Sequence, residues 1–530
     1  MPTITRGEWV RVWALALIVV AVTSVPYALG FARSDARHMY SGATLDLVDY
    51  NSHLAKMQQG ARGEWRYLLL FTSEEQAGGY VQTFYIALGH LACVTGLSLP
   101  LVYQAARVVC ALAMMVAMYT LIATLISARP LRWIAYLLAC VGSGLGWLQL
   151  VIVPTPPGGI SPIDFWLMDG FPFFGALTFP HFTASVALMA LVFVGVLALL
   201  NRLSWRTAVW TALGSFALTV IHPFSGGLVI LVASVYAALR VILRLSPWTR
   251  PVPVLGVLAA PAAPVLIYDT WLFSTQPVFR GWSQQNITLS PPPLYYLISY
   301  GLLIVLAIFG GVRLMRRRDA KALLALAWIV VVVPLLYAPT NLQRRFLEGV
   351  MLPLCVLASV GAVCMLRRLV RARQWRRRAL LFLVALALPS NLVLVAGTSV
   401  ASLMRSPSVF YPGDVIAAVD WLGASAGPDD VVLSSFPVGN LIPARIGRRV
   451  VLGHWIETLD YDRKTEQVKA FFGSVMPDDV RRALLHDYSV RFVFWGPDER
   501  KLGDFDPARS AYLIEVFRSG DVILYRVKQP

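Results

Sequence analysis

The sequence is poor in charged residues. Only 14% of its 530 residues are Asp, Glu, Lys or Arg, whereas a soluble domain carries about 25%. Apolar residues make up 57%, and the mean hydropathy is +0.64. A water-soluble fold cannot bury that much apolar surface, so the composition argues against a soluble enzyme, a disordered chain and a nucleic-acid-binding protein.

Cysteine is also scarce. The five cysteines lie in apolar stretches, none follows residue 399, and their spacing matches neither a metal site nor a disulfide framework. We interpret them as buried thiols that pack as small apolar groups. The sequence also lacks a glycine-rich nucleotide motif and obvious internal repeats.

Acidic residues are few in the first three quarters of the chain. Residues 1–398 hold 30 Lys and Arg but only 12 Asp and Glu, whereas residues 399–530 hold 16 and 17. Excess positive charge within an apolar region is typical of cytoplasmic loops in membrane proteins. We therefore predict a polytopic α-helical membrane domain over residues 1–398 and a soluble domain over residues 399–530.

Apolar stretches of about 20 residues are needed to cross a bilayer as helix. Twelve stretches are candidates: 9–30, 81–99, 101–127, 133–153, 182–200, 207–222, 226–243, 252–271, 294–312, 321–338, 346–366 and 378–398. The first follows two arginines and resembles an uncleaved signal anchor.

Arginine clusters between later stretches indicate the cytoplasmic side. With a cytoplasmic N-terminus, an even number of crossings must precede Arg202, but five candidates do. We expect 81–99 and 101–127 to form one crossing plus an interfacial or re-entrant helix, which leaves about eleven spans; an extra crossing within 154–181 is the alternative. Both solutions place the large first loop, 31–80, and the C-terminal domain outside a plasma membrane.

The first outer loop concentrates acidic residues. Six of the twelve acids in residues 1–398 fall within 31–80. Asp46, Asp49 and His53 are spaced three and four apart, which places them on one face of a helix. Two carboxylates and an imidazole at the membrane edge are suited to a general base or a metal site. The alternative is the solvated polar face of an amphipathic helix.

This loop resembles that of the GT-C glycosyltransferases. Residues 49–60 are DYNSHLAKMQQG, followed by Gly63, Glu64 and Trp65, and the family pattern is an acidic pair, a Tyr, a Met and Gly-(Asp/Glu)-Trp. The family includes protein O-mannosyltransferases and the aminoarabinose transferase of lipid A. The resemblance implies a multi-span enzyme that uses a polyprenyl-phosphate sugar at the outer leaflet, with Asp49 as catalytic base.

The match has two departures. Tyr50 replaces the second acid of the pair, although Asp46 lies one turn earlier as a supporting acid. Residues 78–83 also lack the Lys-Pro-Pro that family members often carry before the second span.

Transfer of a sugar from a lipid phosphate requires a carboxylate that deprotonates the acceptor hydroxyl. It also requires positive charge, or a divalent cation such as Mg²⁺ or Mn²⁺, at the departing phosphate. A single displacement would invert the anomeric centre.

Four further polar residues on outer segments are candidates for this site. Asp164 or Asp169 is a candidate second acid. His181 is a candidate hydrogen-bond partner of the donor or a helix cap, and Glu74 orients the acceptor or is simply solvated.

Arg344 and Arg345 precede a late span on the outer side, against the positive-inside trend. An outer-leaflet phosphate would offset the cost of these charges, because a guanidinium binds phosphate bidentately. The segment is similar to the Arg-Tyr or Arg-Phe found before a late span in many GT-C enzymes. The alternatives are a lipid-headgroup anchor and an ion pair with Glu348.

The C-terminal domain alternates helix-like and strand-like segments, which predicts a small α/β fold. Strand-like segments are 431–433, 450–452, 491–495 and 522–525, and helix-like segments are 414–422, 464–472 and 479–486. Residues 453–461 follow a strand, where α/β folds place ligand sites. This segment is a candidate for acceptor binding or for docking onto the membrane domain.

The predicted function is a glycosyltransferase that moves a sugar from a polyprenyl-phosphate donor to a lipid, glycan or protein acceptor. The rival hypotheses are a transporter or lipid flippase, and a non-catalytic GT-C-like assembly partner. Transporters often carry charged residues in mid-span, whereas here the central spans are nearly free of charge.

Overall fold

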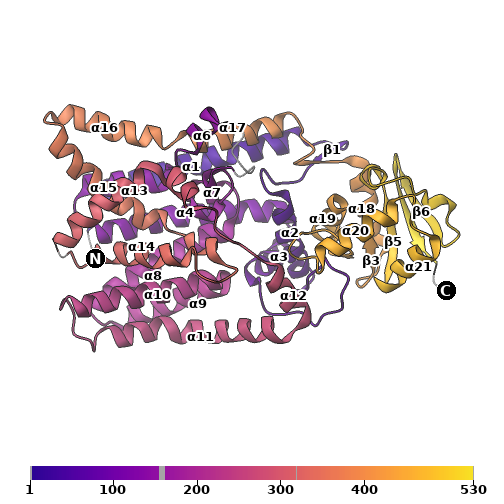
Figure 1. Ribbon diagram of the computed structural model, residues 1–530, viewed down its shortest axis with the longest axis horizontal. Coiled ribbons are helices and arrows are strands. Elements are labelled where there is room, and N and C mark those ends of the chain that lie inside the picture. Colours follow the sequence, from indigo (N-terminus) through magenta and orange to yellow (C-terminus); the bar gives the residue numbers. More distant parts are fainter. Residues whose placement is uncertain (1–2, 154–160, 318, 529–530) are drawn as a thin grey trace. The chain divides into compact units, whose positions relative to one another are not determined.

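The computed structural model describes residues 3–153, 161–317 and 319–528 (Figure 1). Its internal contacts divide the chain into two compact units. The first unit comprises Met1–Pro26, Ala105–Tyr268 and Ile287–Thr398, and the second comprises Tyr27–Gln104, Asp269–Asn286 and Ser399–Pro530. The second unit thus contains both the first outer loop and the C-terminal residues, which the sequence placed in different domains.

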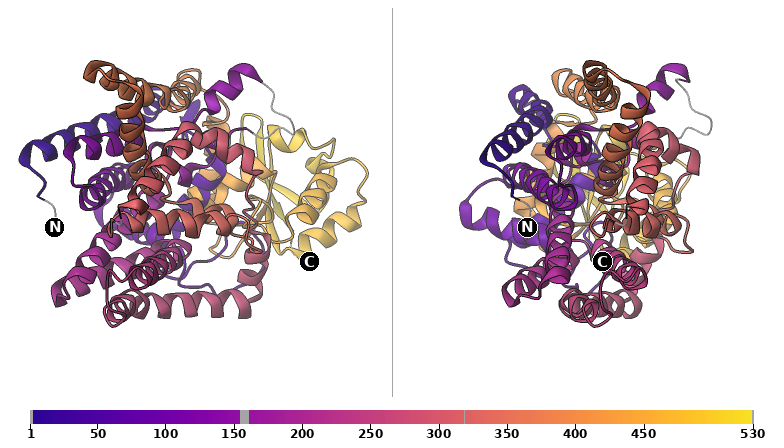
Figure 2. Two further views of the ribbon diagram at one scale, coloured as in Figure 1. Left: turned by 60° about the vertical axis from the view of Figure 1, so that its left-hand side comes forward. Right: turned by 90° about the vertical axis from the view of Figure 1, so that its left-hand side faces the viewer.

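The regular elements of the first unit's described residues are all helices, and the right-hand view of Figure 2 looks along several of them. Its helices are α5 (Arg129–Val141), α6 (Gly146–Ile152), η2 (Ile163–Phe165), η3 (Met168–Gly170), α7 (Pro172–Leu177), α8 (Pro180–Asn201), α9 (Trp205–Ile221), α10 (Pro223–Ile242), α13 (Pro293–Arg316), α14 (Leu323–Leu335), η4 (Gln343–Leu347), α15 (Met351–Leu369) and α16 (Arg373–Leu386). Four more helices contribute residues to both units: α1 (Arg6–Arg33), α4 (Leu99–Leu125), α11 (Pro251–Thr275) and α17 (Pro389–Leu403).

Among the described residues, eight helices are long and apolar enough to span a membrane, or nine if the bent pair of α5 and α6 is one span. The chain is therefore a polytopic membrane protein. The expected count of about eleven already leaves out one of the stretches 81–99 and 101–127, and it exceeds this number because two further stretches form shorter helices. α9 has 17 residues and α14 has 13. The stretch 81–99 forms α3 (Thr83–Thr95), which also has 13 residues and stops at Gly96, whose φ is +69°. A 13-residue helix is too short to cross a bilayer, which suits the interfacial helix expected near residues 81–99.

A five-stranded sheet forms the centre of the C-terminal domain, as expected for an α/β fold. Its order is β4-β3-β5-β7-β6; β4, β3 and β5 run parallel, and β7 and β6 continue antiparallel. Apolar residues alternate along β5, so Phe492 and Phe494 face one side of the sheet and Val493 the other. The strands are β3 (Val431–Leu433), β4 (Arg449–Val450), β5 (Val490–Trp495), β6 (Leu513–Ser519) and β7 (Val522–Val527).

Helices cover both faces of this sheet (Figure 1). One core packs α18 and α19 against the sheet, and the other packs α20 and α21 against its opposite face. The four helices are α18 (Gly413–Ser425), α19 (Phe436–Ile446), α20 (Tyr461–Phe472) and α21 (Asp478–Asp487). The domain also has two short helices, α22 (Pro497–Arg500) and η5 (Pro507–Arg509).

The first outer loop packs into the same unit. Its helix α2 (Leu47–Ala61) lies against α3 and α19, and Ala55, Leu70 and Phe71 join the core beneath α18 and α19. β1 (His38–Tyr40) pairs antiparallel with β2 (Phe410–Pro412), and α12 (Pro277–Gln285) belongs to this unit as well. At the contact with α3, a Cβ on Gly60 would lie 2.0 Å from the carbonyl oxygen of Ile86, so only glycine permits this close approach.

A buried ion pair fixes α2 against residues 453–458. The Lys56 ammonium lies 3.0 Å from Glu457 Oε1, and both side chains are almost fully buried. Ser52 donates a hydrogen bond to Glu457 Oε1 at 2.8 Å and the Tyr67 hydroxyl donates to Oε2 at 2.5 Å. A carboxylate removed from water needs such matching donors, because an isolated buried charge is strongly destabilising.

We expect Lys56→Met and Glu457→Gln each to lower the free energy of unfolding by about 3–5 kcal/mol, because each leaves a buried partner unmatched. The double variant should lose less than the sum of the two. Thermal unfolding of the full chain in lipid nanodiscs measures this, with the exposed Lys469→Met as control. Strictly additive losses would contradict the coupling of these two charges.

Candidate active site

Two of the sequence-predicted acids open helix α2. Asp46 is its N-cap, in the left-handed conformation at φ 48°, and its Oδ1 accepts a hydrogen bond of 3.2 Å from the backbone nitrogen of Asp49. Asp residues tolerate this conformation and are favoured caps. Asp49 lies in the first turn with its side chain 34% exposed. The carboxylates therefore gather at the helix N-terminus, where the backbone dipole favours negative charge.

Asp46 and Asp49 have different environments. Burial, reinforced by the negative charge of Asp49, raises the pKa of Asp46 to about 7. Asp46 therefore holds a proton for about half of the time near neutral pH. An acid pair in which one member is buried and the other faces solvent is a frequent arrangement in active sites.

One face of α2 is directed at residues 453–458 of the C-terminal domain. Asp49 Oδ1 lies 3.1 Å from His454 Nε2, and the next two positions on this face, Ser52 and Lys56, bind Glu457. Burial opposes the charge of Glu457, yet the positive charge of Lys56 and the hydrogen bond from the Tyr67 hydroxyl keep the pKa of Glu457 below its usual value. Glu457 therefore stays ionised and holds the loop in place.

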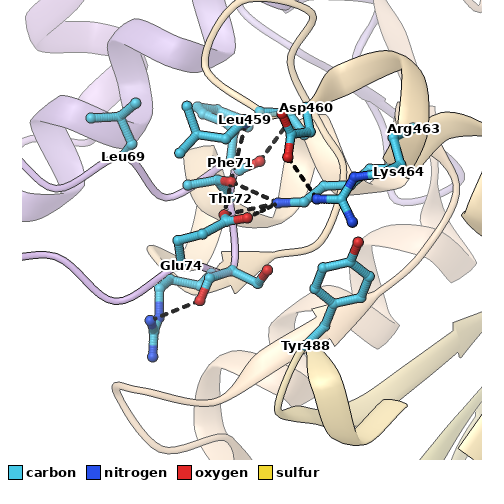
Figure 3. Close-up of polar contacts among 12 residues, drawn as sticks. Leu69, Phe71, Thr72, Glu74, Leu459, Asp460, Arg463, Lys464 and Tyr488 are labelled. Carbon is cyan, nitrogen blue, oxygen red and sulfur yellow. Dashed lines mark hydrogen bonds and ion pairs between the residues drawn. The ribbon is translucent and has the colours of Figure 1, made fainter. Parts of the chain in front are cut away.

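His53 and Glu74 have partners of their own. The His53 ring is buried and stacks on Tyr85 of α3, with centroids 4.0 Å apart and an interplanar angle of 9°. Glu74 binds the fully buried Lys464, whose Nζ lies 2.7 Å from Glu74 Oε1. Figure 3 shows Lys464 pointing at Thr72 and Glu74, while Arg463 turns to Asp460. These contacts attach the end of the first loop to α20.

The remaining candidates lie in the first unit. In η4, the Arg345 guanidinium is 3.7 Å from Asp169 Oδ2 and lies over the Phe182 ring at 6.0 Å. The Arg344 guanidinium lies over the Trp166 ring at 5.1 Å. Aromatic rings and a carboxylate thus offset the cost of the two charges, and a guanidinium stacked on a ring can still donate from its edge.

Asp164 and Asp169 have distinct surroundings. Asp164 Oδ2 accepts hydrogen bonds from the Ser390 hydroxyl at 2.7 Å and from the backbone nitrogen of Gly146 at 3.2 Å. It therefore caps the start of α6. Of the two acids, Asp169 is the one that lies beside a predicted phosphate ligand, Arg345.

His181 lies at the start of α8, with its ring 5.9 Å from that of His222. His222 Nδ1 is 2.7 Å from Glu348 Oε2, and the Ser185 hydroxyl also donates to this oxygen at 3.1 Å. Glu348 is fully buried. An ion pair of Arg344 or Arg345 with Glu348 was one expected alternative; in the structure Glu348 contacts His222, and Arg345 pairs with Asp169.

Metal-ligating side chains do not gather in the part of the chain that the structure describes: no group of three or more His, Cys, Asp or Glu has the geometry to hold an ion. The spacing of Asp46, Asp49 and His53 had indicated such a site as one alternative. His53 faces Tyr85, and the residue that approaches Asp49 is His454, from 405 positions further along the chain.

Neither a scan against protein-family models nor a search of curated proteins finds a match for this chain. Comparison with solved structures does find matches, and they define the class: the chain has the fold of the GT-C glycosyltransferases, integral membrane proteins with a C-terminal soluble domain.

Three of these structures illustrate the likeness. The archaeal oligosaccharyltransferase AglB of Archaeoglobus fulgidus, in complex with an inhibitory peptide and a dolichol-phosphate, has a TM-score of 0.54 and 12% identity, over 92% of this chain and 70% of that one. ArnT from Cupriavidus metallidurans bound to undecaprenyl phosphate has a TM-score of 0.53 and 14% identity, over 98% of both chains. The mycobacterial arabinofuranosyltransferase AftD has a TM-score of 0.55 and 15% identity, over 100% of this chain and 42% of that one.

We expect Asp46→Asn to change the pH dependence of stability. The folded-state pKa of about 7 exceeds the ordinary value of 3.8, so the folded chain keeps a proton that the unfolded chain releases. The stability linked to this proton is present below pH 3.8 and is lost as the pH rises through 7. Asparagine mimics the protonated acid, so the variant should melt about 2 °C or more above wild type at pH 8. The difference should vanish near pH 4.

Thermal unfolding in nanodiscs across pH 4–8 measures this effect, with the exposed Asp487→Asn as the matched control. A constant offset at all pH values would contradict the raised pKa.

Proposed function

We propose that this chain is a glycosyltransferase that takes a sugar from a polyprenyl-phosphate donor at the outer face of the plasma membrane. The proposal places the N-terminus in the cytoplasm and residues 399–530 outside, as an extracytoplasmic domain beside the membrane domain of residues 1–398. The acceptor would be a hydroxyl of a lipid, glycan or protein. The observation that carries the proposal is the pair of Asp46 and Asp49 at the start of α2, within a GT-C fold.

Asp49 is assigned as the base. Its carboxylate is partly exposed, whereas the acid beside it is buried and has a raised pKa. A base must be ionised and reachable by the hydroxyl that it deprotonates. Asp46, protonated for much of the time, serves as the supporting acid.

Arg344 and Arg345 are assigned to the donor phosphate. Both are held by aromatic rings, and Arg345 is also held by Asp169. A pre-oriented guanidinium suits a phosphate group, which it can bind through two parallel hydrogen bonds. AglB and ArnT are solved with dolichol-phosphate and undecaprenyl phosphate respectively, which supports a lipid phosphate as ligand. Asp169 and His181 complete this donor site in the proposal.

The proposed step is a single displacement. Asp49 takes the proton from the acceptor hydroxyl while that oxygen bonds to the anomeric carbon of the sugar. The bond from this carbon to the phosphate oxygen breaks, and the electron pair leaves with the polyprenyl phosphate. The positive charge of Arg344 and Arg345 stabilises the departing phosphate. The anomeric configuration of the product is inverted.

We expect Asp49→Asn to fold as wild type does but to lose transfer by at least about 100-fold, because the amide cannot take the acceptor proton. The assay follows the release of undecaprenyl phosphate from a panel of synthetic undecaprenyl-phosphate pentoses and hexoses. It is run in nanodiscs with envelope lipid and glycan fractions as acceptors. The control is Glu64→Gln, an exposed acid of the same loop. Full activity of Asp49→Asn would refute the assignment of Asp49 as the base. If wild type turned over none of the donors, the proposed transferase activity would be contradicted.

We expect Arg345→Gln to weaken the binding of undecaprenyl phosphate by about 10-fold or more, because a hydrogen bond to a charged group contributes about 1.5–3 kcal/mol. Arg344→Gln should weaken it by less. Native mass spectrometry with titrated undecaprenyl phosphate measures affinity, and Arg280→Gln, an exposed arginine on α12, is the control. Unchanged affinity for undecaprenyl phosphate in the Arg344/Arg345 double variant would refute the assignment of these arginines to the donor phosphate. Tight binding without turnover of any donor would favour a non-catalytic assembly partner.

A further inference from the structure

His454 connects the C-terminal domain to the proposed base. It follows β4, its side chain is 3% exposed, and its Nε2 lies 3.1 Å from Asp49 Oδ1. The two residues are 405 positions apart in the chain. The buried ring therefore contacts a carboxylate whose own side chain is 34% exposed.

The backbone around His454 determines which ring nitrogen carries the proton. The amide groups of Ile456 and Glu457 lie 3.1 Å and 3.2 Å from Nδ1, and each can only donate. Nδ1 must therefore accept, and the proton of the neutral ring is on Nε2. Nε2 is the nitrogen that faces Asp49, so the ring donates its N–H to the carboxylate. A second proton on Nδ1 would oppose both amides.

The loop that carries His454 is held independently of Asp49. Thr458 Oγ1 accepts hydrogen bonds from the backbone nitrogens of Gly453 and His454, at 3.2 Å and 3.1 Å, and donates to the carbonyl oxygen of Phe71 at 2.7 Å. Glu457 is bound by Lys56. The imidazole is thus placed before any substrate arrives, as preorganised catalytic groups are.

We propose that His454 is a positioning residue for Asp49. Its neutral imidazole donates a hydrogen bond from Nε2 to Oδ1, which sets the rotation of the carboxylate and stabilises its ionised, proton-accepting form. The charged groups nearest this pair are Asp46 at the N-cap and the Lys56–Glu457 ion pair along the same helix face. The inference rests on the proposed function, because it assigns His454 to the base of that reaction.

Two variants separate the two nitrogens of the ring. In His454→Asn, the side-chain oxygen takes the place of Nδ1 and still accepts from the two amides, but no donor reaches Asp49. In His454→Gln, the longer amide brings an N–H to the position of Nε2, and the acceptor for the loop is lost. A role in catalysis predicts that Gln preserves turnover better than Asn, and a role confined to the loop predicts the reverse.

Kinetics of the full chain in nanodiscs decide between these roles, with the undecaprenyl-phosphate sugars above as probes. We expect His454→Asn to lower kcat by roughly 10- to 100-fold with KM little changed, and His454→Gln to recover most of this loss. In His454→Asn the acidic limb of the pH–rate profile should move to higher pH, because the Asp49 carboxylate loses a donor that favours its charged form. The exposed His486→Asn is the control. Wild-type kcat in His454→Asn, alongside an inactive Asp49→Asn, would overturn the inference while leaving the proposed function intact.

Nitrogen NMR tests the hydrogen bond without any substrate. The chain has seven histidines, so ¹⁵N-histidine labelling of the full chain in nanodiscs gives few signals, and His454→Gln identifies the one required. We expect the Nε2–H tautomer at pH 8, with an Nε2–H signal that shifts in Asp49→Asn. An Nδ1–H tautomer, a cationic ring, or no response to Asp49→Asn would overturn the inference even if no donor is turned over.

Discussion

The arrangement of the candidate base depends on one buried ion pair. Glu457 is almost completely removed from water and receives donors from Lys56, Ser52 and Tyr67. Because a buried carboxylate is tolerated only with such partners, α2 and residues 453–458 have essentially one relative placement. Asp49 lies one turn before Ser52, and His454 lies three residues before Glu457. The contact between Asp49 and His454 is therefore set by the Lys56–Glu457 ion pair, which has no part in the step proposed for Asp49.

The same principle organises the arginine cluster of the first unit. Arg345 has Asp169 beside it and the Phe182 ring beneath it, and Glu348 is in contact with His222 and Ser185. Each buried charge thus has a specific partner, as expected where water is scarce. The sequence predicts these two arginines on the outer side of the membrane, where arginines are unusual by the positive-inside rule. Here their cost is offset locally, and the guanidinium edges remain suited to a phosphate.

Fold and function are separate inferences for this chain. Structural matches to AglB, ArnT and AftD, at 12–15% identity, show a shared fold, and one fold can host several activities. The activity is inferred from particular groups: the Asp46–Asp49 pair with unequal burial, the imidazole that donates to Asp49, and the stacked arginines. This combination suits a base and an anion site better than it suits a translocation path, for which charged residues within the spans would be expected.

Local sequence patterns predicted most of the elements and failed where the pattern was interrupted. The strands β3, β5 and β7 and the helices α18, α20 and α21 match the expected segments closely. α19 was missed because it contains Pro437, Gly439 and Pro443, which are unfavourable in helices. A Cβ on Gly439 would lie 1.9 Å from the carbonyl oxygen of Leu452, so close packing maintains a helix that its sequence disfavours. β6 was missed because its register shifts between Glu515 and Phe517 and breaks the alternation.

By itself, the sequence determined the membrane class, the α/β character of the C-terminal domain, and the helical spacing that brings Asp46 and Asp49 close together. These properties follow from composition, from hydrophobic period and from spacings of three or four residues, all of which are local. Only the tertiary structure decided which groups face those acids. In the structure His53 stacks on Tyr85, and Glu74 forms an ion pair with Lys464. Asp164 accepts a hydrogen bond at the start of α6, and His454 contacts Asp49. Partners some 400 positions apart leave no local pattern, because their pairing is a consequence of burying charge and apolar surface together.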